Sequence, residues 1–435
     1  MGCGDSRNSS DELIMYALID CNNFFVSCER LFRPDLRDKP VVVLSSNDGC
    51  VIARSNEAKA LGIKMGEPYF QVKTLCKRYQ VHIFSSNFVL YGDLSRRVMS
   101  VIESAWPETE IYSIDEAFLD LRSLPGITSD IFCTDLQRKI LKAVGIPVSI
   151  GIGPSKTLAK IANHICKKKL KIPVFDISNQ REWLKHIDVG EVWGIGRRWH
   201  KKLLQRGIYT AYDLSMANPY LLRAGFNVTL QRTAMELQGI SCLDTDDISP
   251  RKSIMSSRSF ADMQTDFENL AQAVSYHCAR ACEKLRENHL LAQYLSVFLL
   301  TNRFRQDLPQ YYNGIELQLT VPTDDVRLLT KRAKEGLKKL FRCGFHYKKV
   351  GVRLEQLLSK HHVQLDIFHQ RDSIASEKKE QLMMAFDSIK QKYGRHSIKL
   401  AAEGYRMSWL GNAALKSPAY TTSWSSLPVV TCRQT

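Results

Sequence analysis

Short apolar runs bounded by turn-forming residues predict buried strands in the first part of the chain, and amphipathic segments between them predict helices. The first run spans residues 14–19 and ends at Asp20. The expected strands lie at 14–20, 41–44, 110–114, 117–122 and 148–151, and the expected helices at 24–30, 56–61, 88–104, 130–144 and 156–168. If the insertion at 24–86 is set aside, the order of these elements is β-α-β-β-α-β.

The second half of the chain repeats this order after a region of short helices at 176–240. Strands are expected at 254–262, 292–303, 314–321 and 347–357, and helices at 266–287 and 324–341. The polar segment Asp244–Pro250 reads as a linker, and a further helix is expected at 377–393. The fold class is therefore α+β, with two split-βαβ units of the ferredoxin-like type.

Composition adds a partner class to this picture. The 435 residues are too many for one core, so two to four domains are expected. A formal charge of +16 favours a polyanionic partner, most often nucleic acid, although a merely soluble basic protein remains an alternative. No apolar run is long enough for a membrane span, and no signal peptide is evident, so a cytoplasmic, nucleoid-associated protein is expected. The 12 cysteines include no CxxC pair, which argues against a zinc site.

Three acidic residues carry the candidate chemistry. Asp20 ends the first strand, and the adjacent pair Asp115 and Glu116 interrupts the apolar segment 112–119. The central strands of a split-βαβ unit end near each other, so these carboxylates are expected to meet. Buried carboxylates in one place repel one another unless a cation compensates them, and oxygen ligands suit Mg²⁺. Such a site fits two-metal nucleotidyl transfer; the alternative for each acid is a solvent-facing strand-end cap.

Two further patterns favour contact with nucleic acid. The turn Gly194-Ile195-Gly196 precedes Arg197 and Lys201, as in a helix-hairpin-helix that grips the phosphate backbone, although an ordinary helix-helix turn is the alternative. The second β-α-β-β-α-β series is rich in basic residues and lacks an acidic trio. The candidate DNA contacts there are Arg258, Arg303, Arg305 and Lys331.

Several long motifs resemble the Y-family DNA polymerases, in particular their UmuC-like branch, which includes the catalytic subunit of bacterial DNA polymerase V. The motifs are Asp20-Cys21-Asn22-Asn23-Phe24-Phe25, Lys39-Pro40-Val41-Val42-Val43, Cys50-Val51-Ile52-Ala53-Arg54-Ser55-Asn56-Glu57-Ala58-Lys59, Ser113-Ile114-Asp115-Glu116-Ala117 and Trp193-Gly194-Ile195-Gly196. The resemblance runs from Tyr16 to Val430, and a Ser-Pro-x-Tyr-Thr-Thr segment at 417–422 is particular to the UmuC-like branch. The role of this last segment is not readable from its residues.

The resemblance implies a right-hand polymerase with a ferredoxin-like palm, small fingers, a helical thumb and a second ferredoxin-like domain, the little finger. The implied bounds are a disordered extension at 1–13, the palm at 14–23 and 87–175, the fingers at 24–86, the thumb at 176–241, a linker at 242–250, the little finger at 251–357 and a tail at 358–435. The implied activity is error-prone translesion DNA synthesis without proofreading, in SOS-type mutagenesis.

The resemblance also assigns roles to single residues. Asp20, Asp115 and Glu116 would hold two Mg²⁺ ions, with the carbonyl of Cys21 as a further ligand. Phe25 would be the steric gate that excludes a ribose 2′-OH, with a core aromatic as its alternative. Phe24 lies beside it at the nucleotide, although a core position is favoured for Phe24. Arg54, Asn56, Lys59 and Lys167 match positions at the triphosphate. Lys167 is also part of a lysine run that could simply be solvated.

The segment Gln364-Leu365-Asp366-Ile367-Phe368 fits a sliding-clamp peptide, with Gln364, Leu365, Ile367 and Phe368 as the anchors. The implied partners are primer-template DNA, dNTP, the clamp, a processed UmuD-type dimer and the RecA filament, with no membrane. Two other hypotheses are a nucleotide cyclase, which a palm with paired acids also suits, and a non-catalytic DNA- or clamp-binding scaffold.

Overall fold

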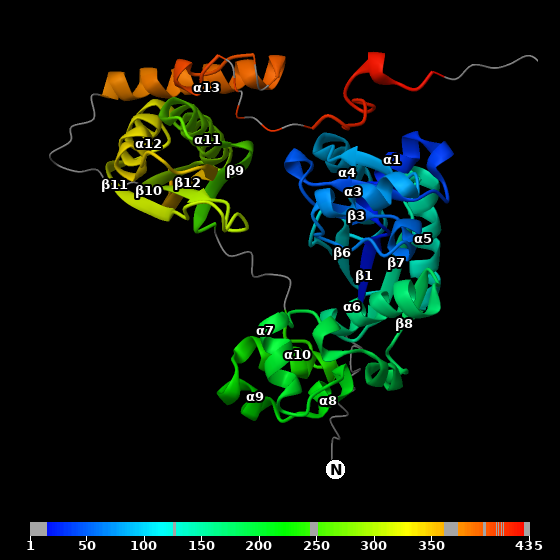
Figure 1. The fold of residues 1–435 in the computed structure, drawn as a ribbon. Coiled ribbons are helices and arrows are strands. Elements are labelled where there is room, and N and C mark those ends of the chain that lie inside the picture. The colour runs from blue at the N-terminus through cyan, green and yellow to red at the C-terminus, as the bar shows by residue number, and fades with distance from the viewer. Residues whose placement is uncertain are drawn as a thin grey trace, which may run out of the picture. The chain divides into compact units, whose positions relative to one another are not determined.

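The computed structural model describes residues 15–124, 128–243, 251–360, 373–394, 397–405, 407, 409, 411 and 413–429. The chain divides into two compact units, one comprising residues 1–248 with 414–435 and the other residues 249–413. Both combine helices and sheets, which confirms the α+β class (Figure 1). The candidate clamp segment 364–368, the N-terminal extension and the linker core 244–250 lie outside the described residues.

The first unit is built on a five-stranded sheet with the order β5-β6-β1-β7-β8. Its strands are β1 (Tyr16–Cys21), β5 (Thr109–Ile111), β6 (Glu116–Asp120), β7 (Val148–Gly153) and β8 (Val174–Asp176), and its crossover helices are α4 (Phe88–Ala105) and α5 (Ser129–Val144). The first four strands in chain order have the ferredoxin-like arrangement, as expected. Strand β8 extends the sheet by pairing parallel to β7.

Alternation along β1 decides which side chains face which layer. Ala17, Ile19 and Cys21 belong to the core that includes residues of α4 and α5. Tyr16 and Leu18 pack on the opposite face, where α6 (Lys156–Ile165) covers the sheet. A Cβ at Gly151 would lie 2.1 Å from the main-chain nitrogen of Asn163, so only glycine permits α6 to approach β7 this closely.

The insertion of the first unit forms a small layer of its own. It contains α1 (Phe24–Phe32), α2 (Asn56–Ala60), α3 (Tyr69–Arg78) and the strands β2 (Val41–Leu44), β3 (Val51–Arg54) and β4 (His82–Ser85), which pair in the order β3-β2-β4. Strand β2 and helix α2 were expected from the sequence, whereas β3, α3 and β4 were not. Residues of α1, among them Phe24 and Val26, lie in the core of the large sheet.

A helical region follows β8. Its helices are α7 (Arg197–Leu204), α8 (Ala211–Met216), α9 (Pro219–Gly225) and α10 (Val228–Leu237). Short helical turns occur at Pro34–Leu36, Ser46–Asp48, Arg181–His186, Val189–Glu191, Ala401–Glu403 and Trp424–Ser426, and a π-helical turn at Cys166–Leu170 continues α6. The helices of this region pack around a separate apolar cluster that includes Leu203, Leu214 and Leu237.

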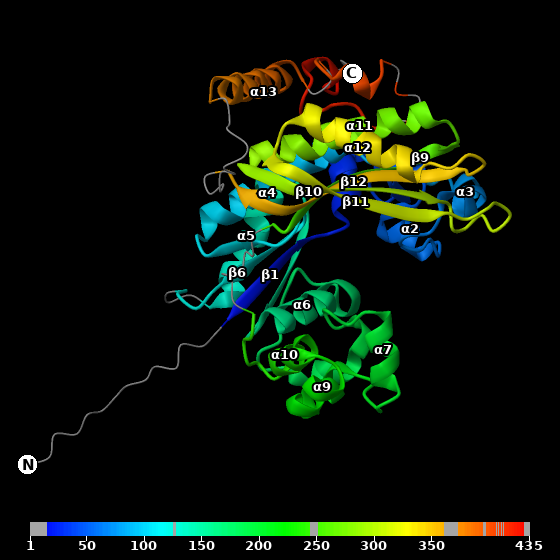
Figure 2. The ribbon, with the colours of Figure 1, turned by 90° about the vertical axis from the view of Figure 1, so that its left-hand side faces the viewer.

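The second unit follows the β-α-β-β-α-β order, with two helices on one face of a four-stranded sheet (Figure 2). Its elements are β9 (Ser253–Gln264), α11 (Phe267–Glu287), β10 (Leu290–Thr301), β11 (Tyr312–Thr323), α12 (Val326–Leu340) and β12 (Tyr347–Ser359). The strands are arranged as β11-β10-β12-β9. Strand β12 thus lies between β9 and β10, so the ferredoxin-like description holds for the order of elements along the chain and not for the order of strands.

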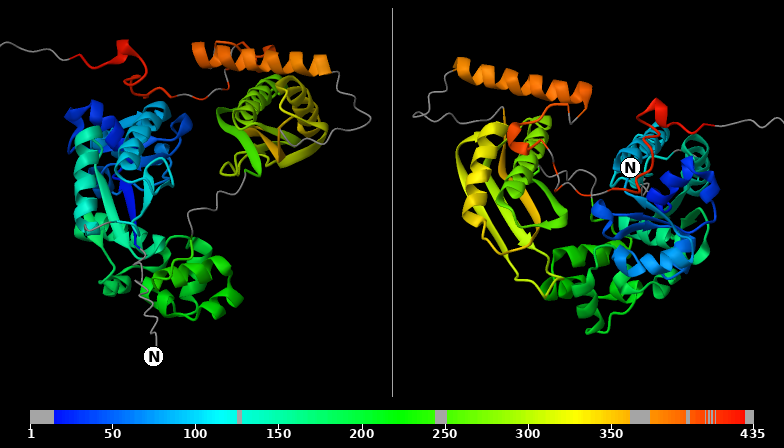
Figure 3. Two further views of the ribbon diagram at one scale, coloured as in Figure 1. Left: turned by 180° about the vertical axis from the view of Figure 1, so that it is seen from behind. Right: turned by 45° about the horizontal axis from the view of Figure 1, so that its top comes forward.

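The tail after the second sheet is divided between the two units. Helix α13 (Ser373–Tyr393) lies over α11 and α12, on the side away from the sheet (Figure 3). It is fixed there by an ion pair between Asp387 and Arg286, and Trp409 inserts into the core of the same unit with 1% of its surface exposed. Residues from 414 onward belong to the first unit. The expected tail domain 358–435 is therefore two separate attachments.

Candidate active site

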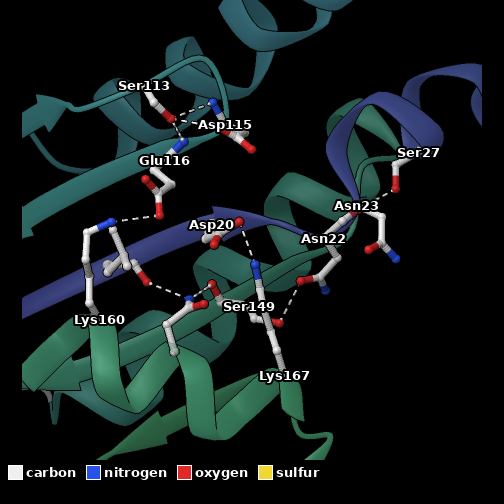
Figure 4. A network of polar contacts seen from close by, with 12 residues as sticks. Asp20, Asn22, Asn23, Ser27, Ser113, Asp115, Glu116, Ser149, Lys160 and Lys167 are labelled. Carbon is white, nitrogen blue, oxygen red and sulfur yellow. Dashed lines mark hydrogen bonds and ion pairs between the residues drawn. The ribbon is translucent and has the colours of Figure 1, made fainter. Parts of the chain in front are cut away.

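The three acidic residues meet where β1 and β6 lie side by side. Asp20 is directly opposite Glu116 in the antiparallel register of the two strands. The main-chain N–H of Cys21 donates to the carbonyl of Asp115 at 2.9 Å. Strand pairing therefore brings residues about a hundred positions apart in sequence to one end of the sheet, on the side covered by α6 (Figure 4).

Each carboxylate has an internal partner. Asp20 forms an ion pair with Lys167 at 2.5 Å, and Glu116 with Lys160 at 2.9 Å. Asp115 accepts a hydrogen bond from the Ser113 hydroxyl at 2.7 Å. Burial raises the pKa of Asp20 above its usual value, and Lys167 opposes that shift.

Each carboxylate is thus engaged by a separate partner. Within the described residues, no group of three or more His, Cys, Asp or Glu side chains stands in position to hold a metal ion. All the candidate ligands are nevertheless oxygen atoms, which is the donor set that Mg²⁺ prefers. The residues present therefore fit Mg²⁺ in the chemistry of their donor atoms.

Lys160 is a functional candidate that the sequence analysis missed. Its ammonium lies over the rings of Tyr112, Phe118 and Trp193, at 4.6, 5.7 and 5.1 Å from their centroids. This aromatic enclosure fixes the cation beside Glu116. The available signal was spacing, because Lys160 and Lys167 are two helical turns apart and face the same acidic end of the sheet.

The two phenylalanines after β1 have different surroundings. Phe24 is 4% exposed and belongs to the core, as its alternative assignment expected, so its side chain is not free to contact a nucleotide. Phe25 is half-buried and stacks on Tyr91, with ring centroids 4.5 Å apart and ring planes at 14°. Phe88 meets the Phe25 ring edge-on at 5.9 Å. Phe25 is therefore the one of the pair that presents a ring at the surface.

A polar cluster links the β1–α1 turn to helix α2. The Lys59 ammonium donates to the side-chain oxygens of Asn23 and Asn56, at 2.6 and 3.1 Å. The pKa of Lys59 is lowered by burial and by the nearby charges of Arg54 and Lys167. One electropositive region beside Asp20 is thus formed by Arg54, Asn56, Lys59 and Lys167. Asn23, which the sequence analysis did not assign, orients Lys59 from a left-handed backbone conformation with φ of 46°.

The most similar relatives place the chain in a known family. It is 44% identical to the Protein UmuC of Salmonella typhimurium over 95% of this chain and 99% of the relative. The chain belongs to the UmuC-like branch of the Y-family DNA polymerases. It is also 37% identical to the Protein MucB of Escherichia coli over 96% of this chain, and 29% identical to the DNA polymerase IV of Oceanobacillus iheyensis over 87% of it.

Family models and solved structures agree with this placement. Residues 19–164 match the impB/mucB/samB family, residues 251–367 its C-terminal domain, and residues 380–430 a domain of unknown function, DUF4113. The fold is similar to that of a Y-family DNA polymerase chimera of Dbh and Dpo4, with a TM-score of 0.64 and 21% identity over 79% of this chain and 99% of the other. The right-hand Y-family fold is thereby confirmed.

The helical region of this polymerase places its hairpin against the acidic end of the sheet. Trp193 packs on Phe118 and Tyr112, at 6.0 and 5.6 Å between ring centroids. Gly194 has φ of +88°, which requires glycine, and α7 begins directly after Gly196. Arg197 and Lys201 are exposed on α7. The hairpin therefore presents main-chain N–H groups and two cations to the surface.

The candidate DNA contacts of the second unit do not share one surface. Arg258 is opposite Val350 in the β9–β12 register, and Val350 is buried under the helices, so Arg258 points to the helix-covered face and is half-buried. Lys331 is exposed on α12. Arg303 and Arg305 lie exposed in the loop between β10 and β11, where Arg305 forms an ion pair with Asp307 at 2.6 Å.

Proposed function

We propose that this chain adds dNTPs to a primer 3′-OH by two-metal nucleotidyl transfer at Asp20, Asp115 and Glu116. It is a DNA-directed DNA polymerase of the translesion type, acting without proofreading in SOS mutagenesis. The observation that carries the proposal is the register of β1 and β6, which sets Asp20 opposite Glu116 and ties Asp115 to the adjacent Cys21 in a Y-family chain.

The metal-holding residues would be the three carboxylates and the Cys21 carbonyl. Bound Mg²⁺ ions would lower the pKa of the primer hydroxyl and neutralise the triphosphate and the pyrophosphate that leaves. The burial of Asp20 beside the like charges of Glu116 and Asp115 supports this assignment, because clustered carboxylates favour a bound cation. Lys167 and Lys160 hold the acids in its absence.

The cations around the acids would orient the incoming nucleotide. Arg54, Lys59 and Lys167 provide positive charge for the triphosphate, and Asn56 provides a hydrogen-bond donor. Phe25 would lie beneath the sugar and exclude a 2′-OH. Stacking on Tyr91 restricts the motion of its ring, which a gate of this kind requires.

The remaining regions would grip primer-template DNA. By its place in the chain, the region at 176–241 is proposed as the thumb, with Gly194, Gly196, Arg197 and Lys201 at the phosphate backbone. The second unit is proposed as the little finger, with Arg303 and Arg305 as exposed candidates in one loop, Lys331 exposed on α12 and Arg258 half-buried under the helices. The palm and fingers are proposed at 14–23 with 87–175 and at 24–86.

The partners follow from the family rather than from described contacts. A sliding clamp would bind Gln364, Leu365, Ile367 and Phe368, and a processed UmuD-type dimer and the RecA filament would activate synthesis. Such a protein would work at the nucleoid. Within the described part of the chain, no helix is both long and apolar enough to cross a membrane.

The decisive experiment is primer extension on an undamaged template with Mg²⁺ and dNTPs. It compares the wild type, Asp115→Ala/Glu116→Ala and the control Glu103→Ala, which removes an exposed carboxylate from α4. The clamp, activated RecA and the UmuD-type partner are included, so that missing activation does not imitate a dead enzyme. Extension by the wild type and the control alone is expected. Equal extension by the double variant would refute the site, and no extension by any form with DNA binding intact would favour the scaffold.

A further inference from the structure

A short segment near the end of the chain, residues 415–420, attaches to the back of the candidate nucleotide site; we call it the clasp. The main-chain N–H of Ser85 donates to the Leu415 carbonyl at 3.0 Å, and the Leu415 N–H donates to the Ser85 hydroxyl at 3.0 Å. Lys416 bridges to Ser85 in parallel. The clasp therefore joins the first unit at the end of β4, just before α4 begins.

Ser417 is the buried centre of the clasp, with 7% of its surface exposed. The Asn87 amide donates to the Ser417 hydroxyl at 3.0 Å and to the carbonyls of Ser417 and Pro418, each at 3.3 Å. Asn87 is also the N-cap of α4, because its side-chain oxygen accepts from the N–H of Leu90. One buried side chain thus serves both the start of α4 and the clasp.

The clasp contacts α1 at two points as well. The Ser417 hydroxyl donates to the carboxylate of Glu29 at 3.1 Å. Tyr420 stacks on Phe32, with ring centroids 4.5 Å apart and planes at 7°. Ser417 and Tyr420 therefore fasten the clasp to α1 as Asn87 fastens it to α4.

Helix α1 carries Phe25, the ring that is proposed as the sugar gate, and α4 carries Tyr91, the ring that stacks on it. Phe25 and Glu29 are one turn apart on α1, and Asn87 and Tyr91 are four residues apart at the start of α4. The Tyr91 hydroxyl donates to the same Glu29 oxygen at 2.7 Å, and the Tyr91 ring stacks on Phe25. A continuous set of contacts therefore runs from Ser417 through Glu29 and Tyr91 to Phe25.

Glu29 is the residue through which a loss of the clasp would affect Tyr91 and Phe25. It is fully buried, and within the described structure its second carboxylate oxygen has no hydrogen-bond partner. Burial raises its pKa, whereas the bonds from Tyr91 and Ser417 oppose that shift. Removing the Ser417 hydroxyl would leave Glu29 with one donor, Tyr91, and would leave the Asn87 amide with two acceptors, both main-chain carbonyls, instead of three.

We propose that the clasp positions Phe25 for sugar discrimination, with Ser417 as its positioning residue. This inference rests on the proposed role of Phe25 as the steric gate. It gives a task to part of the segment 380–430, which matches a domain of unknown function, and to the terminal Ser-Pro-x-Tyr segment. Without the clasp, Glu29 keeps its bond to Tyr91 but is itself held less firmly, so the Tyr91 and Phe25 rings move more readily and a ribose 2′-OH is tolerated.

The test measures single-nucleotide insertion of an rNTP and of the matching dNTP by the full chain with its activating partners. Ser417→Ala is expected to raise the ratio of rNTP to dNTP kcat/KM about tenfold, because a lost hydrogen bond to a buried charge is worth about one factor of ten. Trp424→Ala is the control, since Trp424 lies in the same tail with 90% of its surface exposed. Its ratio is expected to equal that of the wild type. An unchanged ratio in Ser417→Ala, or an equal rise in Trp424→Ala, would overturn the proposal.

Two further variants distinguish a failure of the proposed gate at Phe25 from a failure of the proposed clasp. Phe25→Ala tests the gate itself: if it raises rNTP insertion while Ser417→Ala does not, the gate stands and the clasp is refuted. If Phe25→Ala leaves the ratio unchanged, gate and clasp are both refuted, while the acidic double variant still reports on the polymerase. Tyr91→Phe keeps the ring stack and removes only the hydroxyl bonded to Glu29, so it tests the connection should Ser417→Ala fail to fold. No rise in the ratio with Tyr91→Phe would also count against the clasp.

Discussion

The two β-α-β-β-α-β units of this chain follow the same order of elements and yet differ in what their central strands carry. In the first unit β1 and β6 are neighbours, and Asp20 lies opposite Glu116. In the second unit the central strands are β10 and β12, whose facing residues include Leu295 opposite Leu354 and Val297 opposite Val352. On a helix-covered face, the same sequence of elements therefore brings charged residues together in the first unit and apolar residues in the second.

This difference shows that the position of a candidate catalytic site depends on which strands are neighbours in the sheet. The order of the elements along the chain does not determine it. The acids of the first unit repel one another, and Lys167 and Lys160 offset that repulsion. The helix-covered face of the central strands in the second unit is stabilised by apolar burial, and Glu355 on the other face is paired with Arg353 at 2.9 Å. The first unit thus keeps three acidic residues that need compensating charge, whereas the second unit is proposed to contact DNA through its surface charges.

The difference between the two units can be tested by neutralising one carboxylate on a central strand of each unit. Asp20→Asn is expected to lower the rate of primer extension at least about 10⁴-fold, because a metal ligand contributes several kcal/mol of transition-state stabilisation. Glu355→Gln on β12 is the matched change; Glu355 accepts a hydrogen bond from Ser296 at 2.6 Å. It is expected to alter the rate less than threefold. Single-turnover extension measures both, and comparable losses would mean that the second unit also takes part in chemistry.

The second unit depends instead on its core, which the tail completes. Trp409→Ala is expected to cost about 3 kcal/mol of stability, because it empties a large buried site beside Phe260 and Tyr276. Hydrogen exchange of the full chain should show lost protection in α11 and β9, with α5 and β7 unchanged. Trp424→Ala is the exposed control. Loss of protection in both units would show that they unfold as one.

A buried histidine should make the second unit sensitive to acid. His277 is 2% exposed and its Nδ1 lies 2.9 Å from the Ser256 hydroxyl, and burial with the nearby cations Arg258, Lys349 and Arg280 lowers its pKa to about 3. Between that pKa and the unfolded value near 6.5, the unfolded chain binds a proton that the folded chain does not, so stability falls as pH falls. The expected loss between pH 6.5 and pH 5 is about 2 kcal/mol.

Urea unfolding monitored by hydrogen exchange of α11 at these two pH values measures that loss. His277→Gln cannot titrate, so its stability should change much less over the same interval. An equal loss in the variant would assign the acid sensitivity to other groups. Together with the tryptophan variant, this result would show whether the second unit is held by its core, as the comparison requires.

The sequence predicted well what local pattern determines. The expected strand 14–20 and helix 88–104 agree with β1 and α4 to within two residues, because unbroken apolar runs and helical periodicity are strong signals. The meeting of Asp20 with Glu116 followed from the ferredoxin-like order, which the first unit has. Strands β3 and β4 were missed, since each is only four residues long and carries little alternation.

What the sequence could not predict depends on contacts between distant segments. The position of β12 between β9 and β10 is set by packing against α11 and α12, which no local pattern records. Lys160 gained its role from rings supplied by three separate elements. The docking of Ser417 on Glu29 joins residues 388 positions apart. Each of these three features depends on tertiary contacts between segments that are distant in the sequence.

The smallest expected effect concerns the basic loop of the second unit, where two arginines two residues apart differ in pairing. Arg305 already forms a bidentate pair with Asp307, whereas Arg303 has no acidic partner among the described residues and lies over the Phe304 ring. Arg303→Ala is expected to weaken duplex binding about threefold and to reduce the slope of log affinity against log salt by about 1, as the loss of one phosphate contact would. Arg305→Ala should weaken duplex binding less than Arg303→Ala, because Asp307 partly neutralises the charge of Arg305, and Asp307→Ala should strengthen binding.

Fluorescence anisotropy over a salt series measures the affinity of these variants for duplex DNA and distinguishes these cases. Equal losses for both arginines would show that the Asp307 pair opens on DNA, and no loss for either would move the DNA contact of this unit away from the loop and onto another surface.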